Sequence, residues 1–129
     1  MNPLATWHQT LKEKNVQNIP SLLADDVVMH SPVVHTPVAG KKIVTLYLTA
    51  AFHTLVNEHF TYVRELSDAN TAILEFTTEI DGIFINGVDM ITWNEEGLIT
   101  DFKVMVRPLK AVNMLHQKMG AMLGQMPKY

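Results

Sequence analysis

The chain has 129 residues, of which 47% are hydrophobic and 18% are charged, and its formal net charge is −3. This length fits one domain and leaves little room for two, so residues 1–129 are expected to form a single domain that buries a core. The interspersed charges form no basic stripe, which argues against nucleic acid as a partner, and the absence of cysteine excludes disulfides, thiol nucleophiles and thiolate metal sites.

Two features bear on where the protein resides. The N-terminus lacks the basic start and apolar stretch of a signal peptide. The most apolar stretch, residues 43–52, contains two threonines and is much too short to span a bilayer. Together with the missing cysteines, these features lead us to expect a soluble, cytoplasmic protein with no membrane partner.

The first half of the chain carries helical patterns around one strand. Asn2-Pro3 is a good helix start, because an asparagine side chain can cap the helix and proline suits its first turn. The apolar spacing then predicts a helix to about residue 14, a shorter helix after Pro20, a strand over 26–31 and a longer helix between Gly40 and residue 55.

The second half alternates like an antiparallel meander. Asp81-Gly82 is a strong two-residue hairpin signal, and turn-forming residues also precede Thr71 and Leu98. Pro108 ends the sheet and can open a final helix. The predicted strands cover residues 59–66, 71–80, 83–93 and 98–107.

The Asp81-Gly82 hairpin also predicts which side chains face the interior. It sets Ile80 against Ile83, and therefore Leu74 against Asp89. If Trp93 lies opposite Leu98 across the next turn, Ile91 faces Thr100 and Asp89 faces Phe102. The inner face is then predicted to carry Leu74, Phe76, Thr78, Ile85, Asp89, Ile91, Phe102, Val104 and Val106. The carboxyl group of Asp89 is the only ionisable group in this set.

The opposite face of the predicted sheet is too apolar to be simply solvated. It mixes acidic and basic residues with Phe84, Val88, Met90, Ile99 and Met105. Because the helices can cover only one face, we expect a homodimer through this outer face.

The motifs that link these elements resemble those of one superfamily. They are Leu23-Ala24-Asp25-Asp26-Val27, Ser31-Pro32, Gly40, Asn94-Glu95-Glu96-Gly97-Leu98-Ile99 and Val106-Arg107-Pro108-Leu109. In this order and spacing they are similar to the SnoaL-like branch of the nuclear transport factor 2-like superfamily, which includes ketosteroid isomerase, scytalone dehydratase and the polyketide cyclases. The resemblance implies an α+β fold, the cystatin-like roll, in which a cone-shaped, curved antiparallel sheet wraps around helices and an apolar pocket. The fold alone does not define an activity, because it hosts unrelated functions.

The resemblance to ketosteroid isomerase also bears on individual residues. Asp89 matches the protonated aspartic acid that helps to hold the enolate oxygen. Trp7 matches the tyrosine that is the second oxyanion donor, and Ser31 matches the aspartate that acts as general base. Since the base is missing, steroid isomerisation by that mechanism is not expected here.

Asp89 is the candidate catalytic residue. Burial beside Phe76, Ile91 and Phe102 would remove water from its carboxyl group, which raises the pKa and provides an acid at neutral pH. The alternative is a structural carboxyl group that is satisfied by water, by the Trp7 indole or by a backbone amide.

The remaining candidate ligand contacts come from the helices, the sheet and the loop after the first strand. Trp7 and Tyr47 combine an apolar body with a polar atom, although aromatic residues at helical spacing are often only core. The full predicted ligand-binding set is Trp7, Ser31, His35, Tyr47, Phe76, Ile91, Phe102 and Val104. His35 is placed at the pocket mouth. Its spacing from His30 fits no standard metal motif, so neither a metal nor another cofactor is expected.

The sequence leaves three functions open. The first is an isomerase, cyclase or lyase type of enzyme that acts on an apolar, cyclic or ketone-bearing molecule with Asp89 as acid or base. The second is a carrier or sensor that binds such a molecule without chemistry. The third is a dimeric protein-interaction domain with a vestigial pocket. The residues favour some form of small-ligand pocket, and they leave the ligand and the existence of a reaction undecided.

Overall fold

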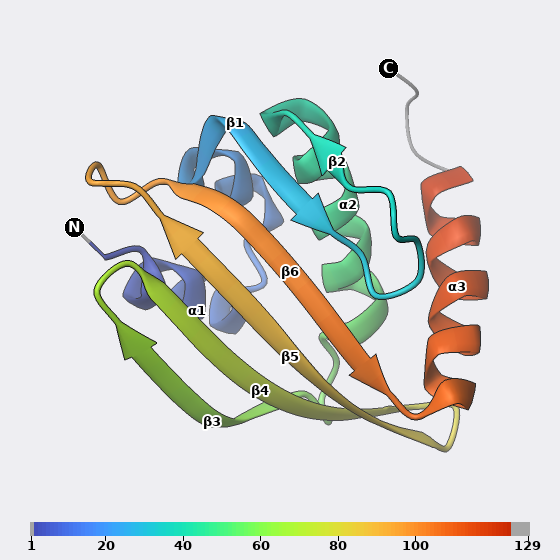
Figure 1. Ribbon diagram of the computed structural model, residues 1–129. Helices are drawn as coiled ribbons and strands as arrows, with labels where there is room; N and C mark the ends of the chain where they lie inside the picture. Colours follow the sequence, from blue (N-terminus) through green and yellow to red (C-terminus); the bar gives the residue numbers. More distant parts are fainter. Residues whose placement is uncertain (1, 125–129) are drawn as a thin grey trace.

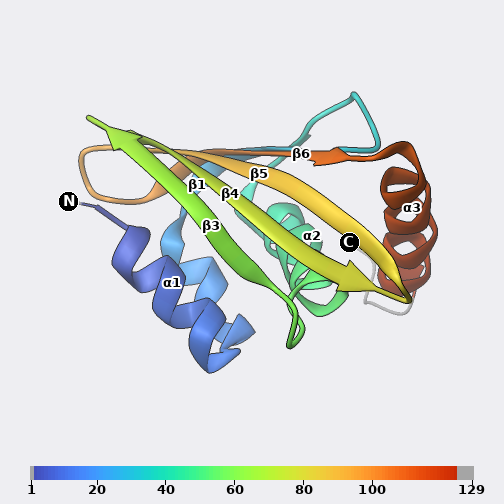
Figure 2. The same ribbon diagram turned by 90° about the horizontal axis from the view of Figure 1, so that it is seen from below.

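The computed structural model describes residues 2–124, in which helices pack on the concave side of a curved six-stranded sheet (Figure 1). Figure 2 shows α1 and α2 under the sheet and α3 at one end of it. The helices are α1 (Leu4–Glu13), the 3₁₀ helix η1 (Val16–Leu22), α2 (Lys41–Leu55) and α3 (Leu109–Gly124). The strands are β1 (Leu23–His30), β2 (Val38–Ala39), β3 (Thr61–Asp68), β4 (Thr71–Ile80), β5 (Ile83–Trp93) and β6 (Ile99–Arg107).

The α+β class and the curved sheet are confirmed, and the sheet is open. The strands lie in the order β2-β1-β6-β5-β4-β3. Strand β1 pairs with β6 in parallel and the other pairs are antiparallel, so the sheet is mixed, whereas we expected a purely antiparallel one. The short strand β2 was not expected, because two residues are too few to produce an alternating pattern.

Local signals account for several element boundaries. The Asn2 side chain accepts a hydrogen bond from the backbone N–H of Leu4 at 2.8 Å, which satisfies one of the free amides at the start of α1. At the β4–β5 turn, Asp81 and Gly82 have φ angles of 52° and 78°. Positive φ at both central positions gives the twist that a two-residue hairpin needs. The predicted bounds of β4 and β5 are therefore confirmed without a shift.

The register between β5 and β6 differs from the prediction. Ile91 lies opposite Phe102, not Thr100, and Asp89 lies opposite Val104. A bulge beside Trp93 adds one residue, and the turn adds another. A shift of two residues leaves the same side chains facing inward, because neighbours along a strand alternate between the two faces.

One outer-face residue was predicted wrongly. Ile99 has 0% exposure and belongs to the core. It pairs with the buried Trp93 on the turn side of the bulge, where the alternation is reversed. Phe84 and Met105 do lie on the outer face, with 73% and 50% exposure.

No helix among residues 2–124 has the combination of length and apolarity that crossing a bilayer requires.

Candidate functional site

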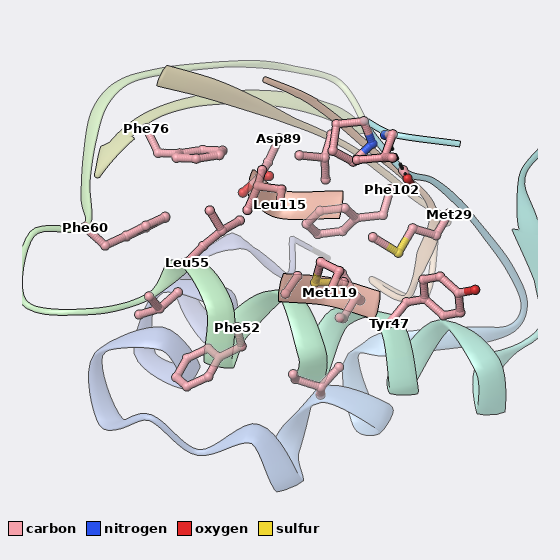
Figure 3. Close-up of a pocket in the computed structure, with 18 of the residues that line it drawn as sticks. Met29, Tyr47, Phe52, Leu55, Phe60, Phe76, Asp89, Phe102, Leu115 and Met119 are labelled. Atoms are coloured by element: carbon pink, nitrogen blue, oxygen red, sulfur yellow. Dashed lines mark hydrogen bonds between the residues drawn. The ribbon is translucent and has the colours of Figure 1, made fainter. Parts of the chain in front are cut away.

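An apolar pocket of about 180 Å³ lies between the concave face of the sheet and the helices. The sheet contributes Phe76 and Phe102, α2 contributes Tyr47 and Phe52, and α3 contributes Met119 (Figure 3). The curvature of the sheet carries its middle away from α2, and aromatic and aliphatic side chains line the space that remains. A concave, mostly apolar space with few polar groups is the usual form of a small-molecule site.

Most of the predicted site residues line this pocket. They are Trp7, Ser31, Tyr47, Phe76, Asp89, Phe102 and Val104. Ile91 and His35 do not line it. Ile91 lies two residues beyond Asp89 along β5 and is fully buried in the core. His35 is exposed in the loop between β1 and β2, and of the two residues beside it only Val34 lines the pocket.

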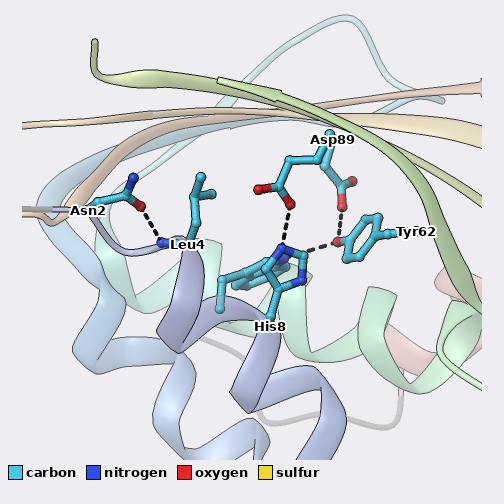
Figure 4. Close-up of polar contacts among 7 residues, drawn as sticks. Asn2, Leu4, His8, Tyr62 and Asp89 are labelled. Atoms are coloured by element: carbon cyan, nitrogen blue, oxygen red, sulfur yellow. Dashed lines mark hydrogen bonds and ion pairs between the residues drawn. The ribbon is translucent and has the colours of Figure 1, made fainter. Parts of the chain in front are cut away.

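A hydrogen-bonded chain connects three of the pocket residues (Figure 4). The indole Nε1 of Trp7 donates to the hydroxyl of Tyr62 at 3.0 Å. That hydroxyl donates to Oδ2 of Asp89 at 2.6 Å. Trp7 therefore supports the carboxyl group through Tyr62, whereas the sequence left water, the Trp7 indole and a backbone amide open as its direct partners. Each residue comes from a different element, namely α1, β3 and β5.

Burial controls the ionisation of this chain. Loss of water around Asp89 raises the pKa of its carboxyl group from 3.8 to about 7, although the hydrogen bond from Tyr62 lowers it in part. The pKa of Tyr62 is raised well above 10.0, first by burial and then by the nearby Asp89 charge. The phenol therefore stays protonated and remains a donor, while the carboxyl group exchanges its proton near neutrality.

The two carboxyl oxygens of Asp89 have different environments. Oδ2 accepts the Tyr62 hydrogen bond, while no described side chain or backbone group bonds to Oδ1. Asp89 lines the pocket. Its Oδ1 atom has no bonded partner among the described residues, and it is not fully buried. Because Tyr62 occupies Oδ2 as a donor, the acid proton belongs on Oδ1, where a ligand can accept it.

Tyr62 was missing from the predicted site because a bulge places it there. The turn before β4 pairs Asp68 with Thr71, and this register continued along β3 would set Tyr62 against Thr77 on the outer face. A bulge between Tyr62 and Arg64 adds one residue, so Tyr62 lies opposite Phe76 and turns inward. The sequence offers one weak signal, an aromatic residue close to the inward Phe76 position.

Packed aromatic rings hold the hydrogen-bonded chain of Trp7, Tyr62 and Asp89 in place. Phe60 stacks on Phe76 with ring centroids 5.2 Å apart, and its ring is perpendicular to that of Tyr62 at 5.1 Å. Trp7 packs against Phe102, also at 5.2 Å. Such ring pairs stabilise one orientation beyond the effect of buried area alone, so the Tyr62 hydroxyl is fixed toward Asp89.

Ser31 has a structural task at the pocket edge. Its hydroxyl oxygen accepts hydrogen bonds from the backbone N–H groups of Val33 and Val34, at 3.0 and 3.1 Å, and thereby holds the turn after β1. A serine hydroxyl in this arrangement is not a general base. His116 of α3 also lines the pocket, on an exposed part of the helix.

Among residues 2–124, the structure contains no cluster of three or more histidine, aspartate or glutamate side chains that could hold a metal ion. His30 instead contacts the carboxylate of Asp101, at 2.9 Å. His30 and His35 are thus not brought together at a shared site.

Comparison with known proteins places the chain in a family. The model of the SnoaL-like domain matches residues 4–102. A crystal structure described as a steroid delta-isomerase from Pseudomonas aeruginosa is 35% identical, with a TM-score of 0.88 over 94% of this chain and 88% of that one. A protein with a cystatin-like fold from Silicibacter pomeroyi is 33% identical, with a TM-score of 0.85 over 94% and 85%. No curated protein matches the sequence.

A more distant match extends the fold alone. An NTF2-like protein from Mesorhizobium loti is 15% identical, with a TM-score of 0.70 over 81% of this chain and 88% of that one. The family match, the two relatives above 30% identity and the curved sheet over a pocket agree. The chain belongs to the SnoaL-like domain family of the nuclear transport factor 2-like superfamily.

Proposed function

We propose that the protein binds a small apolar carbonyl compound and acts on it as an isomerase-type or cyclase-type enzyme, with Asp89 as the acid. The observation that carries the proposal is the hydrogen bond from Tyr62 to one oxygen of a carboxyl group whose pKa is about 7. This arrangement presents the other oxygen, with its proton, to an apolar pocket. A carboxylic acid that is neutral at pH 7 can hydrogen-bond or protonate a carbonyl oxygen. The description of the Pseudomonas aeruginosa relative as a steroid delta-isomerase supports the same reaction type.

The reaction that suits one buried acid is enolisation. Asp89 gives its proton to the carbonyl oxygen while a water molecule takes a proton from the neighbouring carbon. When the enol collapses, carbon regains a proton from hydronium and the oxygen returns its proton to Asp89. In a β,γ-unsaturated ketone, protonation at the γ carbon moves the double bond into conjugation. The low dielectric of the pocket strengthens the hydrogen bond to the developing charge on the oxygen.

A carrier without chemistry is the second candidate, and one observation favours it. Ser31 stands where the resemblance places a general base, and its hydroxyl accepts hydrogen bonds from two backbone N–H groups. Among the described residues that line the pocket, Asp89 supplies the single carboxyl group. A carrier would use its proton only to bind the ligand oxygen.

Cyclohexenone binding and isomerisation of its β,γ-unsaturated isomer distinguish these functions. We expect calorimetry to show cyclohexenone binding to the wild type at about pH 5, with affinity falling about tenfold per pH unit above pH 7 as Asp89 loses its proton. We also expect conversion of the β,γ isomer, which ultraviolet absorbance reports. Asp89→Asn should retain binding through its amide donor, lose the pH dependence and abolish conversion.

Asp25→Asn is the matched control, because the side chain of Asp25 is 99% exposed and lies outside the pocket. It should behave as the wild type does. Binding without conversion would favour the carrier. Binding that does not depend on pH or on Asp89 would contradict the role of the acid.

We further propose a homodimer through the outer face of the sheet. This face carries the exposed Phe84 and Met105 beside the partly buried Val88 and Met90. Sedimentation at micromolar concentration should give a dimer for the wild type and a monomer for Met90→Glu, because an unpaired charge would be buried at the interface. Leu109→Glu changes an exposed residue at the start of α3 and should remain dimeric. A monomeric wild type would contradict the proposal.

A further inference from the structure

The pocket is small for a ligand site. Its volume of about 180 Å³ lies below the range of roughly 300–1,000 Å³ that is usual for small-molecule pockets. It is close to the volume of roughly 150 Å³ at which an apolar cavity accepts benzene. Four fused rings occupy several times the volume of one ring. The space around Asp89 therefore suits one ring more closely than a steroid.

The aromatic ring of Phe76 limits the pocket on the sheet side. Phe76 lies opposite Gly87 in the β4–β5 ladder. A Cβ atom added to Gly87 would lie 2.3 Å from Cζ of Phe76 and 2.9 Å from the backbone oxygen of Met105. The Phe76 ring therefore lies directly over the glycine. Figure 3 shows it extended along the sheet side of the pocket.

The Phe76 ring has no room to move away from the pocket. Its outer side rests on Gly87, and Phe60 stacks on it at 5.2 Å. It is 1% exposed, so its neighbours enclose it apart from the part of its surface that lines the pocket. From the helix side, Leu115 and Met119 limit the same cavity (Figure 3). Phe76 and Gly87 together set the depth of the pocket. Because Gly87 has no side chain, the Phe76 ring can lie flat against the sheet, and the ring then forms the end of the pocket on this side.

We propose that the ligand is a one-ring apolar carbonyl compound, and that Phe76, seated on Gly87, is the residue that excludes larger ring systems. This inference rests on the proposed function, since it places the ligand oxygen at Oδ1 of Asp89. The ring of the ligand then lies among Phe60, Phe76 and Leu115.

A series of enones with increasing numbers of rings tests the size limit. The probes are cyclohexenone, a bicyclic octalone with the same enone group, and the steroid enone testosterone, each titrated calorimetrically at about pH 5. Added apolar carbon normally strengthens binding. The size limit predicts the reverse order for the wild type, with cyclohexenone bound most tightly and testosterone most weakly.

Two substitutions change the limit in opposite directions. Phe76→Leu shortens the barrier, so the octalone should gain about tenfold or more in affinity while cyclohexenone changes little. Leu109→Ala removes side-chain atoms from an exposed position at the start of α3, outside the pocket and the proposed dimer face, and should leave both affinities unchanged. Gly87→Ala pushes the Phe76 ring into the pocket and should lower the affinity for cyclohexenone by a similar factor. The double variant Gly87→Ala with Phe76→Leu should recover the part of that loss that comes from the ring, while the contact with the backbone oxygen of Met105 remains.

The outcomes separate the two proposals. An octalone or testosterone that binds the wild type as tightly as cyclohexenone would overturn the size limit and leave the proposed function standing. The same holds if Phe76→Leu leaves the octalone affinity unchanged. Failure of all three probes to bind would contradict the proposed function and, with it, the inference about ring size.

Discussion

Asp89→Asn is expected to make the protein more stable than the wild type above pH 7, by up to about 4 kcal/mol. The pKa of Asp89 is raised to about 7 in the fold from an ordinary value of 3.8. Below about pH 4 the carboxyl group is neutral in both states, so its burial carries no charge penalty. Between pH 4 and 7 Asp89 ionises in the unfolded chain but stays largely neutral in the folded protein, so the free energy of unfolding falls as the pH rises. Above pH 7 the folded protein contains a buried charge.

Urea denaturation between about pH 4 and pH 8 measures this effect. The wild type should lose stability as the pH rises through this window, and Asp89→Asn should lose much less, because its side chain has the same shape and does not ionise. The two proteins should converge near pH 4. Asp25→Asn, at an exposed site, should follow the wild type. A wild type whose stability does not fall between pH 4 and pH 7 would contradict the neutral acid at this position.

Tyr62→Phe is expected to raise the pKa of Asp89 above about 7 and to lower the stability of the fold by about 1–3 kcal/mol. The phenol donates to the carboxyl group and thereby favours its charged form, so its removal leaves desolvation unopposed. The same change removes the acceptor of the Trp7 indole N–H. An unpaired buried donor costs stability, since water can no longer reach it.

Carboxyl-carbon NMR titration gives the pKa, and urea denaturation gives the stability. Tyr47→Phe is the matched control, because Tyr47 also lines the pocket but makes no hydrogen bond to Asp89. It should leave the pKa of Asp89 unchanged. A Tyr62→Phe protein whose Asp89 titrates at or below the wild-type pKa would show that the phenol does not act on the carboxyl group. Trp7→Phe should cost less in the Tyr62→Phe background than in the wild type, since the hydrogen bond between the two residues is already lost there.

The sequence alone determined the local features of this fold. Asp81-Gly82 adopts the two positive φ angles of a tight hairpin, and adjacent residues are enough to specify that turn. From the turn, strict alternation carries the register outward to Leu74 opposite Asp89. The inward position of Asp89 was therefore predictable, because its cause lies within one hairpin of the chain.

Only the tertiary structure decided the partners of Asp89. Two bulges, one beside Tyr62 and one beside Trp93, reverse the alternation, so that Tyr62 enters the pocket and Ile99 enters the core. A bulge bends and twists its strand. Whether that bend is stable depends on what the curved sheet packs against, and here the helices on its concave side are distant in sequence. The inward position of Asp89 follows from a local turn, whereas the position of Tyr62, which donates a hydrogen bond to it, depends on the curvature of the whole sheet.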